Sequence, residues 1–121
     1  MKHLILLLLF IPTPAKSFTS NDVSNAVNTN RREPLVRNVK LDRAAQAKAN
    51  ALSACSCFTH TLPDGRSPWS LIQKEGYSYK SAGENLAVNF TDVEAMNTAM
   101  FSPGHRKNIL RDFKETGVGF K

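Results

Sequence analysis

The chain has 121 residues, of which 41% are hydrophobic and 21% charged, and its 16 basic and 10 acidic side chains give a formal net charge of +6. This length fits one domain, and the composition excludes a disordered polyelectrolyte and a polytopic membrane protein. Two cysteines are too few for a disulfide-stapled miniprotein, so the fold has to rest on an apolar core.

The N-terminal segment has the pattern of a secretory signal peptide. A lysine near the start precedes an uncharged run from Leu4 to Ile11, which two prolines and small residues at alternate positions follow. The run is shorter than the ~20 residues that a membrane-spanning helix needs. We predict a signal peptide over residues 1–17, cleaved after Ser17 with Ala15 as the second choice, and secretion to the extracellular space or the periplasm. The alternative is a buried N-terminal helix or strand.

Removal of this segment leaves one domain over residues 18–121, which is 104 residues long and carries no transmembrane anchor. The segment contains two lysines and no acidic residue, so the formal charge falls from +6 to +4. The remaining basic residues form no run of five and are not interleaved with aromatic residues. The sequence therefore predicts no nucleic-acid partner.

The first half of the mature chain carries helical patterns. Residues 18–34 hold apolar residues at helical spacing, with Ser20 as the expected N-cap, and Pro34 ends or bends the segment. Residues 41–54 are rich in alanine and predict one helix of about four turns. A Pro-Asp-Gly turn and a Ser-Pro pair then precede a short helix that we expect over 68–75.

The second half adds two strand patterns. We expect a strand near 85–89, then a helix over 91–100 that a T-x-x-E capping box opens. A second Ser-Pro pair predicts a short helix over 103–110, and a final strand is expected over 117–120. Few strands among several helices predict an α+β fold with helices packed on a small sheet.

Three titratable residues stand apart from the helical patterns. His60 follows the alanine-rich segment, Glu84 lies between a glycine and an asparagine, and His105 follows a Pro-Gly pair. Two imidazoles and a carboxylate can hold a divalent ion such as zinc, or they can form an acid/base cluster. Each also has an ordinary structural interpretation, such as a histidine at the end of a helix.

Six short motifs occur in order along the chain and extend over most of its mature part. They are F-T-H-T (58–61), D-G-R (64–66), G-Y (76–77), A-G-E-N-L-A (82–87), S-P-G-H-R-K-N-I-L (102–110) and G-V-G (117–119). This set resembles the bacterial branch of the CAP superfamily, or SCP domain. The superfamily groups cysteine-rich secretory proteins, antigen-five venom proteins and plant pathogenesis-related proteins.

The resemblance implies an α-β-α sandwich with a small antiparallel central sheet and a cleft lined by a histidine/glutamate tetrad. His60, Glu84 and His105 match three members of this tetrad, and the two histidines match metal ligands. In eukaryotic relatives the fourth member is a glutamate that follows a helical tryptophan. This chain has Ala99 in the place of that tryptophan. Glu94 is the nearest acid upstream and the candidate for that place, although the capping box already explains it.

The resemblance also implies an incomplete C-terminal end. Family members usually continue past the G-V-G strand into further strands of the sheet, whereas this chain stops at Lys121. A sheet that lacks these strands has an unpaired edge or an uncovered apolar face. We therefore expect a domain that is truncated at its C-terminal end.

Cys55 and Cys57 are separated by a single residue and are poorly placed to bond each other within a helix. We expect free or buried thiols, with pairing between chains as an alternative. A metal cluster that adds His60 to the two cysteines is a further alternative.

These observations leave three functional hypotheses. The first is a secreted module that binds a divalent metal or an undefined small-molecule, lipid or envelope ligand in the His/Glu cleft. The second is a metal-assisted hydrolase of peptide or ester bonds, in which Glu84 acts as the base towards water on a metal held by His60 and His105. The third is a poorly folded remnant.

Overall fold

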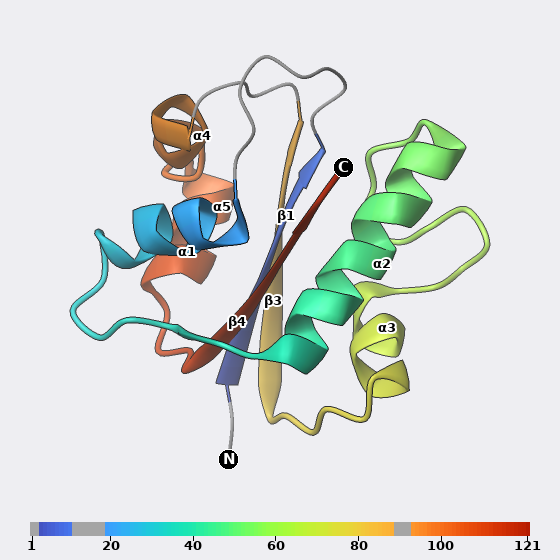
Figure 1. Cartoon of the computed structure of the whole chain (residues 1–121), viewed down its shortest axis with the longest axis horizontal. Coiled ribbons are helices and arrows are strands. Elements are labelled where there is room, and N and C mark those ends of the chain that lie inside the picture. The colour runs from blue at the N-terminus through green and yellow to red at the C-terminus, as the bar shows by residue number, and fades with distance from the viewer. Residues whose placement is uncertain (1–2, 11–18, 89–92) are drawn as a thin grey trace.

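The computed structural model describes residues 3–10, 19–88 and 93–121, which form a sheet between two layers of helices (Figure 1). One layer contains α2 and α3, and the other contains α1, α4 and α5. The α+β fold class and the α-β-α sandwich are therefore confirmed. In chain order the elements are β1 (His3–Phe10), α1 (Ser20–Asn28), β2 (Val36–Arg37), α2 (Val39–Cys55), α3 (Pro68–Lys74), β3 (Ser81–Val88), α4 (Val93–Ala99), α5 (Pro103–Leu110) and β4 (Glu115–Phe120).

Within the described residues, the sheet has four strands in the order β2-β4-β1-β3. All three strand pairs between the described residues are parallel, so the expected antiparallel pairing is wrong here. The reason lies in the connections, because α4 and α5 carry the chain back between β3 and β4 and let both strands run in one direction. β4 pairs on one side with β1 and on the other side with β2.

The N-terminal segment supplies a central strand of this sheet. β1 pairs with β3 from His3↔Ser81 to Phe10↔Val88, and with β4 from Leu4↔Glu115 to Leu9↔Phe120. In the whole chain this segment is thus a strand, which the sequence offered as the alternative to a signal peptide. Cleavage after Ser17 stays a prediction, and residues 11–18 lie outside the described part.

Local signals place the helices where the sequence predicts them. α2, α3 and α5 confirm the helices expected over 41–54, 68–75 and 103–110, each within two residues at either end. The expected N-cap of the first helix is wrong, because Thr19 rather than Ser20 caps α1 in a capping box with Asp22. The T-x-x-E box before α4 begins at a residue outside the described part and stays a prediction.

The described side chains form two core clusters, one on each face of the sheet. Helices α1, α4 and α5 cover a cluster that includes Val23, Val27, Met96, Met100, Ile109, Phe113 and Val118. Helices α2 and α3 cover a second cluster that includes Leu41, Ala44, Ala45, Leu52, Leu71, Ile72 and Leu86. Both faces of the sheet are therefore covered by apolar side chains.

The G-V-G motif brings β4 into close contact with α2. A Cβ atom on Gly117 would collide with the backbone of Leu41, and one on Gly119 would collide with the backbone of Ala45. The alanine-rich face of α2 and the two glycines of β4 therefore form one closely packed interface.

Among the helices that the structure describes, none is long and apolar enough to cross a bilayer.

Candidate functional site

The carboxylate of Glu84 is the centre of the candidate site. Glu84 lies on β3 and its side chain is 1% exposed. The Nζ atom of Lys48, on α2, lies 3.2 Å from both Oε1 and Oε2 of Glu84, and the Lys48 side chain is 0% exposed. A buried lysine thus pairs with the buried carboxylate and supplies it with two hydrogen bonds.

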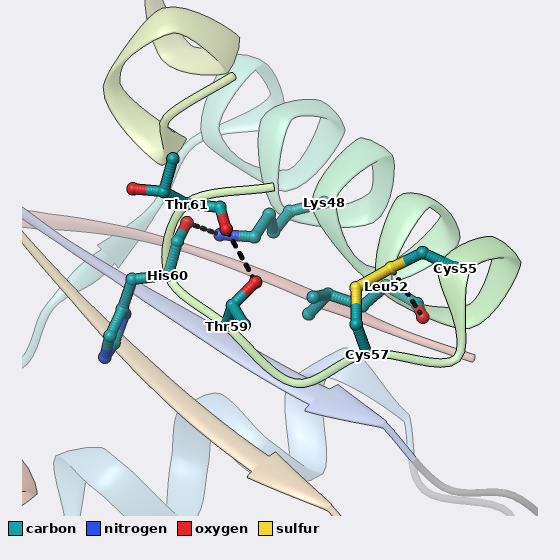
Figure 2. The surroundings of a disulfide bond; sticks show 7 residues. All are labelled: Lys48, Leu52, Cys55, Cys57, Thr59, His60 and Thr61. Atoms are coloured by element: carbon teal, nitrogen blue, oxygen red, sulfur yellow. Dashed lines mark hydrogen bonds between the residues drawn. A yellow bond between two sulfur atoms is a disulfide. The ribbon is translucent and has the colours of Figure 1, made fainter. Parts of the chain in front are cut away.

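His60 joins the same carboxylate from the loop that follows α2. Its Nδ1 atom lies 2.7 Å from Oε1 of Glu84, while 65% of its side chain is exposed. The ammonium of Lys48 also donates a hydrogen bond to the backbone carbonyl of His60. Figure 2 shows the Lys48 side chain reaching this carbonyl while the imidazole points away from it. Lys48 therefore fixes both the carboxylate and the loop that carries the histidine.

Burial acts on both charges of the ion pair. It raises the pKa of Glu84, an effect that the hydrogen bond from His60 and the charge of Lys48 oppose. Burial likewise lowers the pKa of Lys48, and the charge of Glu84 opposes this shift. Each charge is thus maintained by the other, because neither is in contact with water that would stabilise it.

His105 lies on the other side of β3. Glu84 and Asn85 are neighbours on this strand, so their side chains point to opposite faces of the sheet. The Asn85 side chain donates to the His105 carbonyl (3.2 Å) and accepts from Asn108 (2.8 Å), which joins α5 to β3. The His105 Nδ1 atom lies 3.1 Å from Oγ of Ser102. His60 thus contacts the Glu84 side chain on one face of β3, and the backbone of His105 contacts the Asn85 side chain on the other face.

The structure therefore brings together two of the four predicted cleft residues in direct contact, His60 and Glu84. Among the described residues, no hydrogen bond or ion pair joins His105 to either of them. Glu94 lies on α4, and its side chain falls outside what the structure describes. β3 is the last strand in the described order of the sheet, so the side chains on both of its faces lie at the same edge of the sheet.

Lys48 was not predicted as a site residue, although its position on α2 carries a signal. Lys48 lies seven residues after Leu41, on the stripe that also contains Ala45, Ala49 and Leu52. A charged residue on the buried face of a helix needs a partner of opposite charge. The stripe thus indicated a buried ion pair, but the spacing along the helix did not identify Glu84 as the partner.

The carboxylate of Glu84 does not fit as a ligand of the divalent metal that the family resemblance implies. Both oxygens of Glu84 accept hydrogen bonds from an ammonium that has no access to solvent. A metal ion on this carboxylate would lie next to that positive charge, and it would compete with His60 Nδ1 for Oε1. Within the described ranges, no group of three or more His, Cys, Asp and Glu side chains is placed to hold a metal ion.

The two cysteines form a disulfide, so the expectation of free thiols is wrong (Figure 2). Helix α2 ends at Cys55, and Ser56 takes a left-handed conformation (φ 51°, ψ 40°) that turns the chain. This turn brings the Cα atoms of Cys55 and Cys57 to 5.2 Å, within the range that a disulfide requires. With both sulfurs bonded to each other, the alternative metal cluster with His60 has no thiolates.

Two pockets lie away from the Lys48–Glu84–His60 cluster, and none of its three residues lines either of them. One has a volume of about 660 Å³ and is lined by Asn30, Arg31, Arg32, Glu33, Leu110, Arg111, Asp112 and Lys114. The other has a volume of about 590 Å³ and is lined by Asn38, Val39, Lys40, Gly76, Tyr77, Ser78 and Tyr79.

Comparisons with known proteins agree with the motifs that surround the site. The sequence profile of the cysteine-rich secretory protein family (CAP) matches residues 25–121. The chain is 39% identical over 90 residues to the uncharacterized protein YkwD of Bacillus subtilis (strain 168), a match that covers 73% of this chain and 35% of the relative. The chain thus spans about a third of that relative. No solved structure matches it. The profile match and this identity show that the chain belongs to the CAP family of cysteine-rich secretory proteins.

Proposed function

We propose that the protein is an exported binding module whose ligand contacts the exposed imidazole of His60. The observation that carries this proposal is the 2.7 Å contact between His60 Nδ1 and a carboxylate that is itself buried. The contact orients the ring, and the Nε2 atom has no partner among the described residues. An oriented imidazole at the surface can donate or accept a hydrogen bond according to its protonation.

We expect the ligand to carry an anionic group, such as a phosphate on a lipid headgroup or on an envelope polymer. The formal net charge of +6 for the whole chain, or +4 without residues 1–17, favours association with anionic surfaces. Export is supported by the pattern of residues 1–17, and analysis of the mature N-terminus by mass spectrometry tests it. An exported protein that retains Met1 would contradict cleavage.

Co-sedimentation with vesicles tests the binding site. We expect the protein to sediment with vesicles of phosphatidylglycerol and phosphatidylcholine, and His60→Ala to weaken this binding by roughly tenfold, the effect of about 1.4 kcal/mol. Thr61→Ala is the matched control, because Thr61 is an exposed neighbour on the same loop. Equal binding by wild type and His60→Ala would exclude His60 from the site. Vesicles without phosphatidylglycerol, and inorganic phosphate as a competitor, separate a lipid surface from a free phosphate.

A further inference from the structure

Lys48 occupies the place at Glu84 where a bound cation would lie. Its Nζ atom is 3.2 Å from each carboxylate oxygen, and the same ammonium holds the carbonyl of His60. Three oxygens from two distant parts of the chain thus surround one positive charge. Oxygens arranged in this way also suit a metal ion, but here they are ligands of the ammonium.

The ammonium cannot move aside to admit a second cation. The Lys48 side chain is 0% exposed. The helix that carries it, α2, packs its apolar residues into the core cluster on this face of the sheet. Its charge balances the single negative charge of Glu84, and a divalent ion would add two positive charges beside it without a further carboxylate. Since like charges at such short range repel strongly in a buried site, the carboxylate has no capacity for a metal ion.

We propose that Lys48 is the residue that keeps divalent metal out of the His60–Glu84 pair. The chain carries a histidine and a glutamate of the family motif, but the lysine of α2 makes their site independent of metal. This inference does not depend on which ligand contacts His60, so it stands apart from the proposed binding function.

Isothermal titration with zinc chloride tests this inference on the full chain. Wild type and His60→Ala should give identical isotherms, because any zinc heat then comes from elsewhere on the surface. Lys48→Ala should gain a site that binds zinc at least tenfold more tightly than any site of the wild type. This gain should disappear in Lys48→Ala combined with His60→Ala, because His60 becomes a ligand once the ammonium is absent.

Lys48→Gln is the second variant, because it removes the charge and retains a donor for the His60 carbonyl. It provides the same comparison if Lys48→Ala does not fold, which circular dichroism establishes before the titration. Zinc binding by the wild type that His60→Ala abolishes would overturn the inference, whatever the lysine variants do. A folded Lys48 variant without a gain in His60-dependent binding would overturn it as well, because another feature would then exclude the metal.

Discussion

The buried pair of Lys48 and Glu84 dominates the energetics at the scale of single residues. Both side chains are almost completely buried, and each satisfies the charge of the other. Removing one member of such a pair leaves an uncompensated charge in the interior, which costs far more free energy than the net contribution of the pair itself. Substitution of either residue therefore affects folding as well as the orientation of His60.

We expect Glu84→Gln to lower the free energy of unfolding by about 3–5 kcal/mol, because the ammonium of Lys48 loses its counter-charge. Urea denaturation monitored by circular dichroism measures this change. Glu33→Gln is the matched control, since Glu33 forms an ion pair with Lys114 at 78% side-chain exposure, where solvent screens the interaction and leaves little contribution to stability. A loss for Glu84→Gln no larger than that of the control would contradict the role of the buried pair.

Sequence motifs identified one half of this cluster and not the other. His60 and Glu84 belong to short motifs that the family resemblance makes visible. The contact of Lys48 with Glu84 spans 36 residues of sequence, and only tertiary packing creates it. The Cys55–Cys57 bond was missed for a related reason, because a left-handed Ser56 is not encoded in the helical pattern that precedes it.

Helix α2 and strand β4 approach each other closely at Gly117 and Gly119. A side chain at Gly119 would meet the backbone of Ala45, which cannot give way as a flexible side chain could. We expect Gly119→Ala to destabilise the fold by about 1–3 kcal/mol through overpacking. Chemical denaturation measures this, with Gly104→Ala as the control, because nothing lies within 4 Å of a Cβ atom at Gly104. Equal stabilities of the two variants would show that α2 and β4 have room to separate.

The N-terminus of α1 should depend on pH through its capping box. Hydrogen bonds from Thr19, first from its backbone N–H, hold the pKa of Asp22 below its ordinary value. A lowered carboxyl pKa stabilises the cap at pH values above the ordinary Asp pKa, and this stabilisation is lost as the pH falls through the lowered value. The Thr19 amide resonance in NMR should therefore titrate with a midpoint below about 3.9. A midpoint at or above that value would contradict the cap.

The helices were predictable because their signals are local. Cap residues, prolines in the first turn and apolar spacing placed α2, α3 and α5 within two residues. β1 was only the alternative to a signal peptide, because a lysine before the uncharged run and prolines and small residues after it favour a signal peptide over a buried strand. The parallel pairing of the strands depends on the route of the connecting helices, which no local pattern contains.

At the scale of the whole molecule, β1 lies between β3 and β4 and pairs with both. Removal of residues 1–17 deletes its backbone ladder to both neighbours. We expect residues 18–121 alone to melt at least about 10 °C below the full chain in circular dichroism. Leu7→Pro in the full chain is the companion variant, because proline removes a donor from a strand that is paired on both sides. Identical melting of all three proteins would show that the domain does not need β1.

The position of β1 also determines when the sheet can form during synthesis. The strand is made first, but its partners are residues 81–88 and 115–120. Leu9 pairs with Phe120, so a contact between residues far apart in the sequence has to close before this part of the ladder is complete. Closing so long a loop costs conformational entropy, and this cost lowers the folding rate. The sheet can therefore be completed only after Phe120 has been synthesised, and until then β1 lacks part of its ladder to β4.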